Sequence, residues 1–154
     1  MKISKTYSHN FADLIIRGKN LEKELFDIFD LPTIRAEKKI APTLKENVRN
    51  RLSTCGWTMD PQINIAYNPT INAMKFGVGL MLQTGNITRA FYDLLKFQAM
   101  KENSRIECSI MAVPTVQTSR ELGSNIANFE RITNEIQLYR NIISVPVLIV
   151  GIDD

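Results

Sequence analysis

The sequence predicts an α/β domain in which a mixed β-sheet is covered by helices on both faces. Three apolar runs of strand length carry this prediction, at 76–83, 105–113 and 145–152. The run 76–83 is nearly continuously apolar, as in a central strand that is buried on both faces. Helical periodicity fills the two intervals between them, over 87–101 and from 118 to about 139. The order strand, helix, strand, helix, strand is typical of an α/β sandwich.

Shorter elements are predicted before this core. Residues 2–7 alternate as in a short strand, and apolar residues recur at helical spacing over 10–16 and 20–30. Gly18 separates these two helices, and Pro32 follows the end of the second. We therefore expect one strand and two short helices before Pro32.

A third helix is predicted to begin near Pro42, which suits a first turn, and to end at Gly56, which suits a C-terminal cap. Its apolar stripe consists of Leu44, Val48, Leu52 and Cys55. The stripe leaves Lys45, Arg49 and Arg51 mostly on the solvent side of the helix.

The segment between this helix and the central strand is rich in Pro, Asn and Gln. We expect a loop over 58–74, with one strand at 63–67. After the central strand, Gly85-Asn86 supplies a turn and an N-cap for the helix over 87–101.

The last helical region carries its own boundary signals. Residues 118–121 match a capping box, so this helix is expected to begin at Thr118. We expect it to continue, with a break at Gly123, to about Tyr139.

Composition narrows the class of protein. The 154 residues suit one domain over 1–154, and the hydrophobic (44%) and charged (23%) fractions are those of ordinary soluble proteins. No apolar run is long enough to cross a membrane and the N-terminus lacks a signal peptide, so we expect a cytoplasmic protein without a membrane partner. Cys55 and Cys108 are expected to be reduced thiols, and with the single His9 they cannot form an ordinary zinc site.

Positive charge is concentrated in one stretch of the chain. The net charge is only +3, but between positions 35 and 51 only Glu37 and Glu46 oppose six cationic residues: Arg35, Lys38, Lys39, Lys45, Arg49 and Arg51. A local excess of this kind suits contact with phosphate groups. A solvated helix face explains it equally well, and charge alone does not decide between the two interpretations.

Five stretches of the chain resemble the BglII/BstYI group of type II restriction endonucleases, which have the PD-(D/E)XK nuclease fold. They are Tyr7-Ser8-His9; the helix over 44–57 that ends in Gly56-Trp57; residues 78–94 with Val78, Gln83, Gly85, Tyr92, Asp93 and Leu94; residues 119–136 with Ser119, Glu121, Ser124, Ile126, Glu130 and Asn134; and the terminal run 145–152. The resemblance implies a restriction-endonuclease-like core with a mixed central sheet flanked by helices. The interval 58–75 is shorter than in the family, where an insertion here carries part of the DNA contact surface.

The active-site positions depart from the family pattern. In the family an Asp ends an extended segment and a Glu-x-Gln lies on the next strand. These positions fall here on Asn72, Met81 and Gln83, so only the Gln is kept. Phosphodiester hydrolysis needs a metal to activate water, and Mg²⁺ prefers carboxylate oxygens. With both acids replaced, we expect no metal site and no cofactor, and Mg²⁺ only if the family activity survives. In structural terms, Met81 is interpreted as core packing and Asn72 as a turn residue.

Other acids could replace the missing ones. Glu107 on the next strand is the foremost candidate for a relocated acid, with Asp60 as a second. Asp93 and Glu130 match family residues that coexist with an intact site, so they are poor replacements.

Three hypotheses of function follow. The first is a restriction-endonuclease-like protein that binds double-stranded DNA, pairs as a homodimer and has lost efficient cleavage. Its predicted phosphate contacts are Lys38, Lys39, Lys45, Arg49, Arg51 and Arg89. The second is an active endonuclease with relocated carboxylates. The third is a non-enzymatic partner or inhibitor on an inactive nuclease scaffold, including a heterodimer with an active relative.

Overall fold

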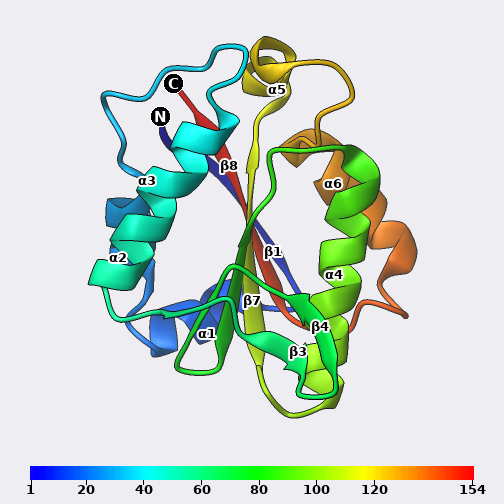
Figure 1. Ribbon diagram of the computed structural model, residues 1–154. Coiled ribbons are helices and arrows are strands. Elements are labelled where there is room, and N and C mark those ends of the chain that lie inside the picture. Colours follow the sequence, from blue (N-terminus) through cyan, green and yellow to red (C-terminus); the bar gives the residue numbers. More distant parts are fainter.

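The computed structural model describes residues 1–154, and its centre is a six-stranded sheet between two layers of helices (Figure 1). The strand order is β1-β8-β7-β6-β5-β2, in which β6, β7 and β8 run parallel and the outer strands are antiparallel to their neighbours. The strands are β1 (Lys2–His9), β2 (Thr58–Met59), β5 (Ala73–Lys75), β6 (Val78–Leu82), β7 (Cys108–Pro114) and β8 (Val147–Asp153). The predicted mixed sheet is confirmed.

Helices cover both faces of the sheet, as predicted. They are α1 (Ala12–Gly18), α2 (Glu22–Phe29), α3 (Ala41–Thr54), α4 (Ile87–Glu102), α5 (Val116–Leu122) and α6 (Phe129–Glu135), followed by the 3-10 helix η1 (Ile136–Tyr139). In Figure 1, α2 and α3 lie on one side of the sheet and α4 and α6 on the other. None of the helices is both long enough and apolar enough to cross a bilayer.

The alternation of side chains along β6 divides the core into two. Leu80 and Leu82 pack with the helices of the N-terminal third, whereas Met81 packs with Phe97 of α4 and its neighbours. This follows from the two-residue period of a strand. Met81 therefore contributes to packing, in agreement with the structural interpretation of its sequence context.

The central strand is shorter than the apolar run that predicted it. Phe76 and Gly77 form the turn of a β5–β6 hairpin and both have positive φ, 50° and 73°. Two successive residues with positive φ are the signature of the tight hairpin turns that match strand twist. The apolar side chain of Phe76 is consequently exposed rather than buried.

The region 58–74 contains more structure than predicted. In place of one strand at 63–67, a hairpin is formed by β3 (Gln62–Asn64) and β4 (Tyr67–Thr70), and residues 65–66 are its turn. Ile65 and Tyr67, which looked like strand interior in the sequence, are exposed at this hairpin. Two strands too short to show a periodic pattern, β2 and β5, also escaped prediction.

The helix expected to begin at Thr118 begins earlier, and this expectation was wrong. Thr115 is the N-cap of α5, and its side chain accepts a hydrogen bond from the Thr118 backbone N–H. The Thr118 side chain is buried and donates to Asp153 at the end of β8. The predicted break at Gly123 is confirmed, since α5 ends there.

The predicted caps of α3 and α4 and the predicted reduced cysteines are confirmed. Gly56 has a φ of 79°, and its N–H and that of Trp57 bond to the Ser53 and Leu52 carbonyls, which is a Schellman cap of α3. Asn86 caps α4 through the Thr88 N–H. Cys55 and Cys108 are free, and burial raises the pKa of the Cys108 thiol to about 12.

Candidate functional site

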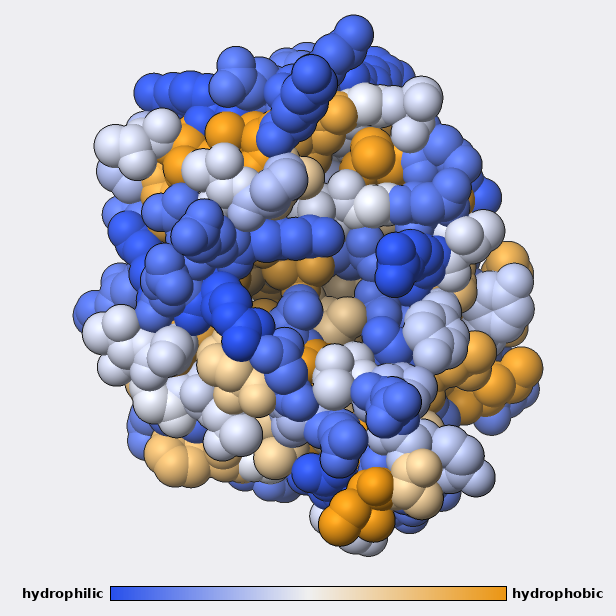
Figure 2. All heavy atoms as spheres, viewed as in Figure 1, coloured by the Kyte–Doolittle hydropathy of each residue, from blue (hydrophilic) through white to orange (hydrophobic).

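A cavity of about 230 Å³ lies where β6 ends, and it brings together Asn72, Met81 and Gln83. Helix α3 contributes Lys45, and helix α4 contributes a group of charged side chains. The remaining lining residues are Thr70, Leu82, Gly85, Arg89, Asp93 and Lys96. Figure 2 shows a hollow near the centre of this face, with hydrophilic side chains around it and hydrophobic atoms at its base.

The strand geometry explains why these residues meet. Met81 and Gln83 are two residues apart, so they project from the same face of the sheet toward α4. Asn72 immediately precedes β5, which pairs with β6. Crevices outside the carboxyl ends of parallel strands are the usual ligand sites of α/β sheets.

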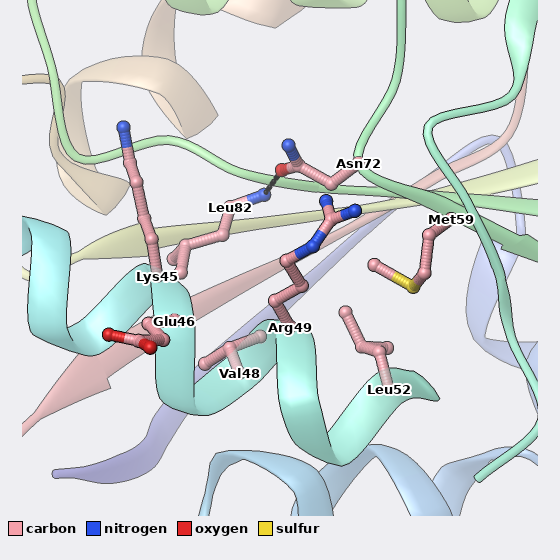
Figure 3. Close-up of a pocket in the computed structure, with 8 residues that line it drawn as sticks. All are labelled: Lys45, Glu46, Val48, Arg49, Leu52, Met59, Asn72 and Leu82. Carbon is pink, nitrogen blue, oxygen red and sulfur yellow. Dashed lines mark hydrogen bonds between the residues drawn. The ribbon is translucent and has the colours of Figure 1, made fainter. Parts of the chain in front are cut away.

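The Asn72 side chain is already committed to the backbone. Its Oδ1 accepts a hydrogen bond from the Leu82 N–H at 2.7 Å, which is the dashed line in Figure 3. The backbone N–H of Asn72 donates to the Sδ of Met81 at 3.1 Å. The side chain thus extends the pairing of β5 and β6, and this bond occupies one of the two lone pairs of its uncharged carbonyl oxygen.

Gln83 belongs to a buried network. Its Nε2 donates to Asp93 Oδ2 at 2.7 Å, and its Oε1 accepts from the Gly85 N–H at 2.7 Å. The other carboxylate oxygen of Asp93 accepts from Lys96 Nζ at 2.9 Å. Gln83 and Asp93 are 6% and 3% exposed, and no buried side-chain polar atom of either residue lacks a hydrogen-bond partner.

A second hollow of about 260 Å³ adjoins the first, because both are lined by Lys45, Asn72 and Leu82. Figure 3 shows it against helix α3, with Val48, Leu52 and Met59 as its apolar wall. Arg49 also lines it, and its guanidinium bonds to both carboxylate oxygens of Asp60, at 3.0 and 2.6 Å. This hydrogen-bonded pair holds the pKa of Asp60 below its usual value.

The structure brings together only some of the predicted site residues. Lys45, Arg49 and Arg89 lie at the two hollows with Asn72, Met81 and Gln83. Arg51 faces elsewhere and donates to the Asp27 carbonyl at 2.7 Å. Lys38 and Lys39 lie in the exposed loop before α3 and line neither hollow.

Glu107 is not near this group. It precedes β7, beside Gly77 at the opposite end of β6, and it pairs with Lys19. Asp60 is closer, because its backbone N–H donates to the Asn72 carbonyl at 3.0 Å.

Sequence reasoning omitted two residues of the cavity, Asp93 and Lys96. The sequence pattern identifies Asp93 as a residue shared with the family and a poor replacement acid, and it gives no role to Lys96. The available signal was their spacing: an acid and a base three residues apart on a helix lie on the same face. That Asp93 and Lys96 share a buried network with Gln83 is visible only in the three-dimensional structure.

The mixed sheet, its helical layers and a cavity at the carboxyl end of β6 define a protein with the restriction-endonuclease fold. A crystal structure of restriction endonuclease BglII complexed with a DNA 16-mer matches with a TM-score of 0.83 and 15% identity, covering 100% of this chain and 79% of that one. A crystal structure of free BglII matches with a TM-score of 0.74 and 17% identity, covering 100% and 81%. No curated protein gave a sequence match.

The family follows from the sequence match. The model of the family described as restriction endonuclease BglII/BglIII matches residues 4–152, and the chain belongs to this family.

The residues present do not fit the Mg²⁺ ion that this family implies. Mg²⁺ takes hard oxygen ligands, usually including carboxylates. Here the Asn72 oxygen accepts a backbone hydrogen bond, Met81 offers a thioether, and Asp93 is bound by Lys96 and Gln83. Nowhere in the chain do three or more His, Cys, Asp or Glu side chains form a group able to hold a metal.

Proposed function

We propose that this protein binds double-stranded DNA as a restriction-endonuclease-like protein whose metal-dependent cleavage is impaired or lost. One observation carries the proposal: no free carboxylate lines the cavity at the end of β6. Asn72 and Met81, which the family resemblance assigns to the positions of the expected acids, line it without a charge, and Asp93 is neutralised by Lys96. Without a hard cation to activate water and to stabilise charge on phosphorus, phosphodiester hydrolysis is slow.

Three features support DNA as the partner. The chain belongs to a restriction endonuclease family, and the similar crystal structure of BglII contains DNA. Lys45 and Arg89 lie around adjoining hollows on one face together with Arg49, which is paired with Asp60. Cationic side chains gathered in this way provide the sequence-independent part of DNA affinity.

A paired assay tests the two halves of the proposal. Supercoiled plasmid is incubated with the purified protein in Mg²⁺ and, separately, Mn²⁺, and fluorescence anisotropy measures duplex binding in EDTA over a range of salt. We expect intact plasmid, and binding that weakens steeply as salt rises. Nicking that depends on the added metal refutes the loss of cleavage, and the absence of any anisotropy change at low salt refutes DNA binding.

Asp60 favours one alternative function, an active endonuclease with a relocated carboxylate. It is the acid whose backbone bonds directly to Asn72, although Arg49 occupies its side chain. If the plasmid is nicked, this alternative predicts that Asp60→Asn abolishes nicking while Glu107→Gln does not.

We also propose a homodimer, formed through an apolar face on α4 and the adjacent segment. Tyr92 and Leu95 are exposed on α4, and Leu138 and Ile142 are exposed beyond it. The edge-to-face contact of Phe91 with Tyr139, with ring centroids 5.5 Å apart, joins the two segments into one surface. Free cysteines support the cytoplasm as its location.

A further inference from the structure

We propose that the cavity at the end of β6 is an anion site, which takes a phosphate group directly and without a metal ion. The inference rests on the proposed function, because the DNA backbone is one source of this group. A cavity with two free carboxylates attracts cations and repels phosphate. This cavity has the opposite preference, for reasons of charge and of hydrogen bonding.

The charges that remain unneutralised in the cavity are both positive. Lys45 and Arg89 line it, and neither side chain forms an ion pair or a hydrogen bond. The only carboxylate in the lining, Asp93, is bound to Lys96 and Gln83. Glu46 lines the adjoining hollow, but its carboxylate points away from the Lys45 ammonium in Figure 3. Two unpaired cations at one cavity favour an anionic ligand.

The hydrogen-bonding groups of Asn72 also make the cavity favour an anion. While its Oδ1 accepts from the Leu82 N–H, its Nδ2 has no partner and is turned away from Leu82 (Figure 3). An aspartate here would present a second acceptor in place of this N–H donor. The amide therefore offers a donor to a phosphate oxygen where the acid would offer a ligand to a metal.

Helix α4 adds a smaller contribution. Its first residue is Ile87, and Gly85 just before it lines the cavity. The N-terminus of a 16-residue helix carries partial positive charge, which favours a nearby anion. Arg89 in the first turn supplies a planar fork suited to two phosphate oxygens, and Lys45 supplies a point charge from the opposite helix.

Nuclear magnetic resonance on the full, uniformly ¹⁵N-labelled chain tests the site, with phosphate and DNA added in EDTA and Mg²⁺ added to a sample from which EDTA has been removed. The reporters are the Arg89 Nε–H and the Asn72 Nδ2 signals, and the probes are inorganic phosphate, Mg²⁺ alone and a short DNA duplex. The cavity variant is Lys45→Ala/Arg89→Ala. Its matched control is Lys2→Ala/Arg120→Ala, which removes two exposed cations that line neither hollow and form no ion pair.

We expect phosphate to shift both reporters saturably in the wild type and the control, and Mg²⁺ to leave them unchanged. In the cavity variant, where the Asn72 signal remains, the phosphate response is lost. Duplex affinity in this variant falls roughly tenfold or more, and the salt slope decreases by about 2. The Asn72→Asp variant keeps the bond to Leu82 and adds a negative charge, so its phosphate affinity also falls.

The outcomes separate this inference from the proposed function. If phosphate saturates the cavity but no duplex binds, the anion site stands for small phosphates and DNA binding is refuted. If the duplex binds the cavity variant as tightly as the control, DNA binding stands and the anion site is overturned. Saturable shifts on Mg²⁺, or none on phosphate, overturn the anion site as well.

Discussion

At the scale of single residues, two uncharged side chains stand at the proposed active-site positions of this cavity. An amide at position 72 keeps the hydrogen bond to Leu82 that an acid could also make, and a thioether at 81 packs among apolar neighbours. The local structure is therefore satisfied without an acid at either position.

Asp93 illustrates a residue whose role in the site is structural. Replacing it with Ala leaves Lys96, 13% exposed, without its partner and removes the Gln83 acceptor. Breaking a buried pair from one side costs about 3–5 kcal/mol of unfolding free energy. Urea denaturation followed by circular dichroism measures this loss. Asp27→Asn, which breaks an exposed pair with Lys23, is the control and should change the midpoint little. Equal effects of the two substitutions would contradict the structural role.

Arg49 is withheld from other anions by Asp60, which leads to a second prediction. Asp60→Asn removes the competing charge, so we expect severalfold tighter DNA binding in EDTA and a salt slope about 1 unit steeper. Anisotropy with a short duplex measures both, and Glu107→Gln is the matched control, since it also removes an exposed acid from an ion pair. Unchanged affinity in Asp60→Asn would remove Arg49 from the DNA-binding surface.

The pair also sets a pH dependence. The hydrogen bonds from Arg49 lower the pKa of Asp60 in the folded protein. Its contribution to stability is therefore complete above the ordinary carboxyl pKa and is lost only as the pH falls through the lowered value. Arg49 consequently stays paired at neutral and mildly acidic pH.

At the scale of elements, long apolar patterns were predictable and short ones were not. Strands β6, β7 and β8 bury side chains on both faces of the sheet, so each one can be recognised in the sequence as a mainly apolar stretch. Strand β2 has only two residues, which is too short to show an alternating pattern of apolar and polar residues. Its pairing with β5 is decided by tertiary contacts. The candidate site was likewise only partly predictable. The family pattern indicated Asn72, Met81 and Gln83, whereas the sequence alone could not show that Lys45 and Lys96 approach them from different helices.

The anchoring of β5 shows how such a short strand is held. Lys75 donates to both oxygens of Glu24 on α2, at 3.0 and 2.7 Å, and to the Cys55 carbonyl at 2.7 Å. Trp57 Nε1 donates to the same Glu24 carboxylate at 2.7 Å. These contacts tie the strand to two helices, and they fix Asn72 at its start.

The β5–β6 turn sets the register between Asn72 and Met81. Gly77 has a φ of 73°, and an added Cβ would lie 3.2 Å from Glu107 Oε1. Gly77→Ala should cost roughly 1–2 kcal/mol of unfolding free energy, because an L-residue is strained in this conformation. Chemical denaturation tests this. The matched control is Gly18→Ala in α1, where a Cβ meets nothing within 4 Å and helix propensity favours Ala. The prediction fails if the two variants are equally stable.

At the scale of the whole molecule, the two layers of helices are used differently. Helices α1, α2 and α3 enclose the larger apolar core, and α3 also presents Lys45 and Arg49 to the hollows. Helix α4 packs on the other face of the sheet and lines the cavity with Arg89. It also exposes Tyr92 and Leu95 to solvent. One helix thus connects the cavity to the apolar surface proposed for dimer contact.

A homodimer through this surface predicts a specific sensitivity to charge. Leu95 is 52% exposed and Leu138 is 78% exposed, so replacing both with Glu leaves the folded monomer intact but places four carboxylates in a two-fold interface. We expect sedimentation velocity to show a dimer for the wild type and a monomer for Leu95→Glu/Leu138→Glu. Leu14→Glu, at a 58% exposed position on α1, is the control and should remain a dimer. A wild type that stays monomeric at high concentration contradicts the homodimer. That result would instead favour contact between this apolar face and a different chain, as the hypothesis of a heterodimer with an active relative requires.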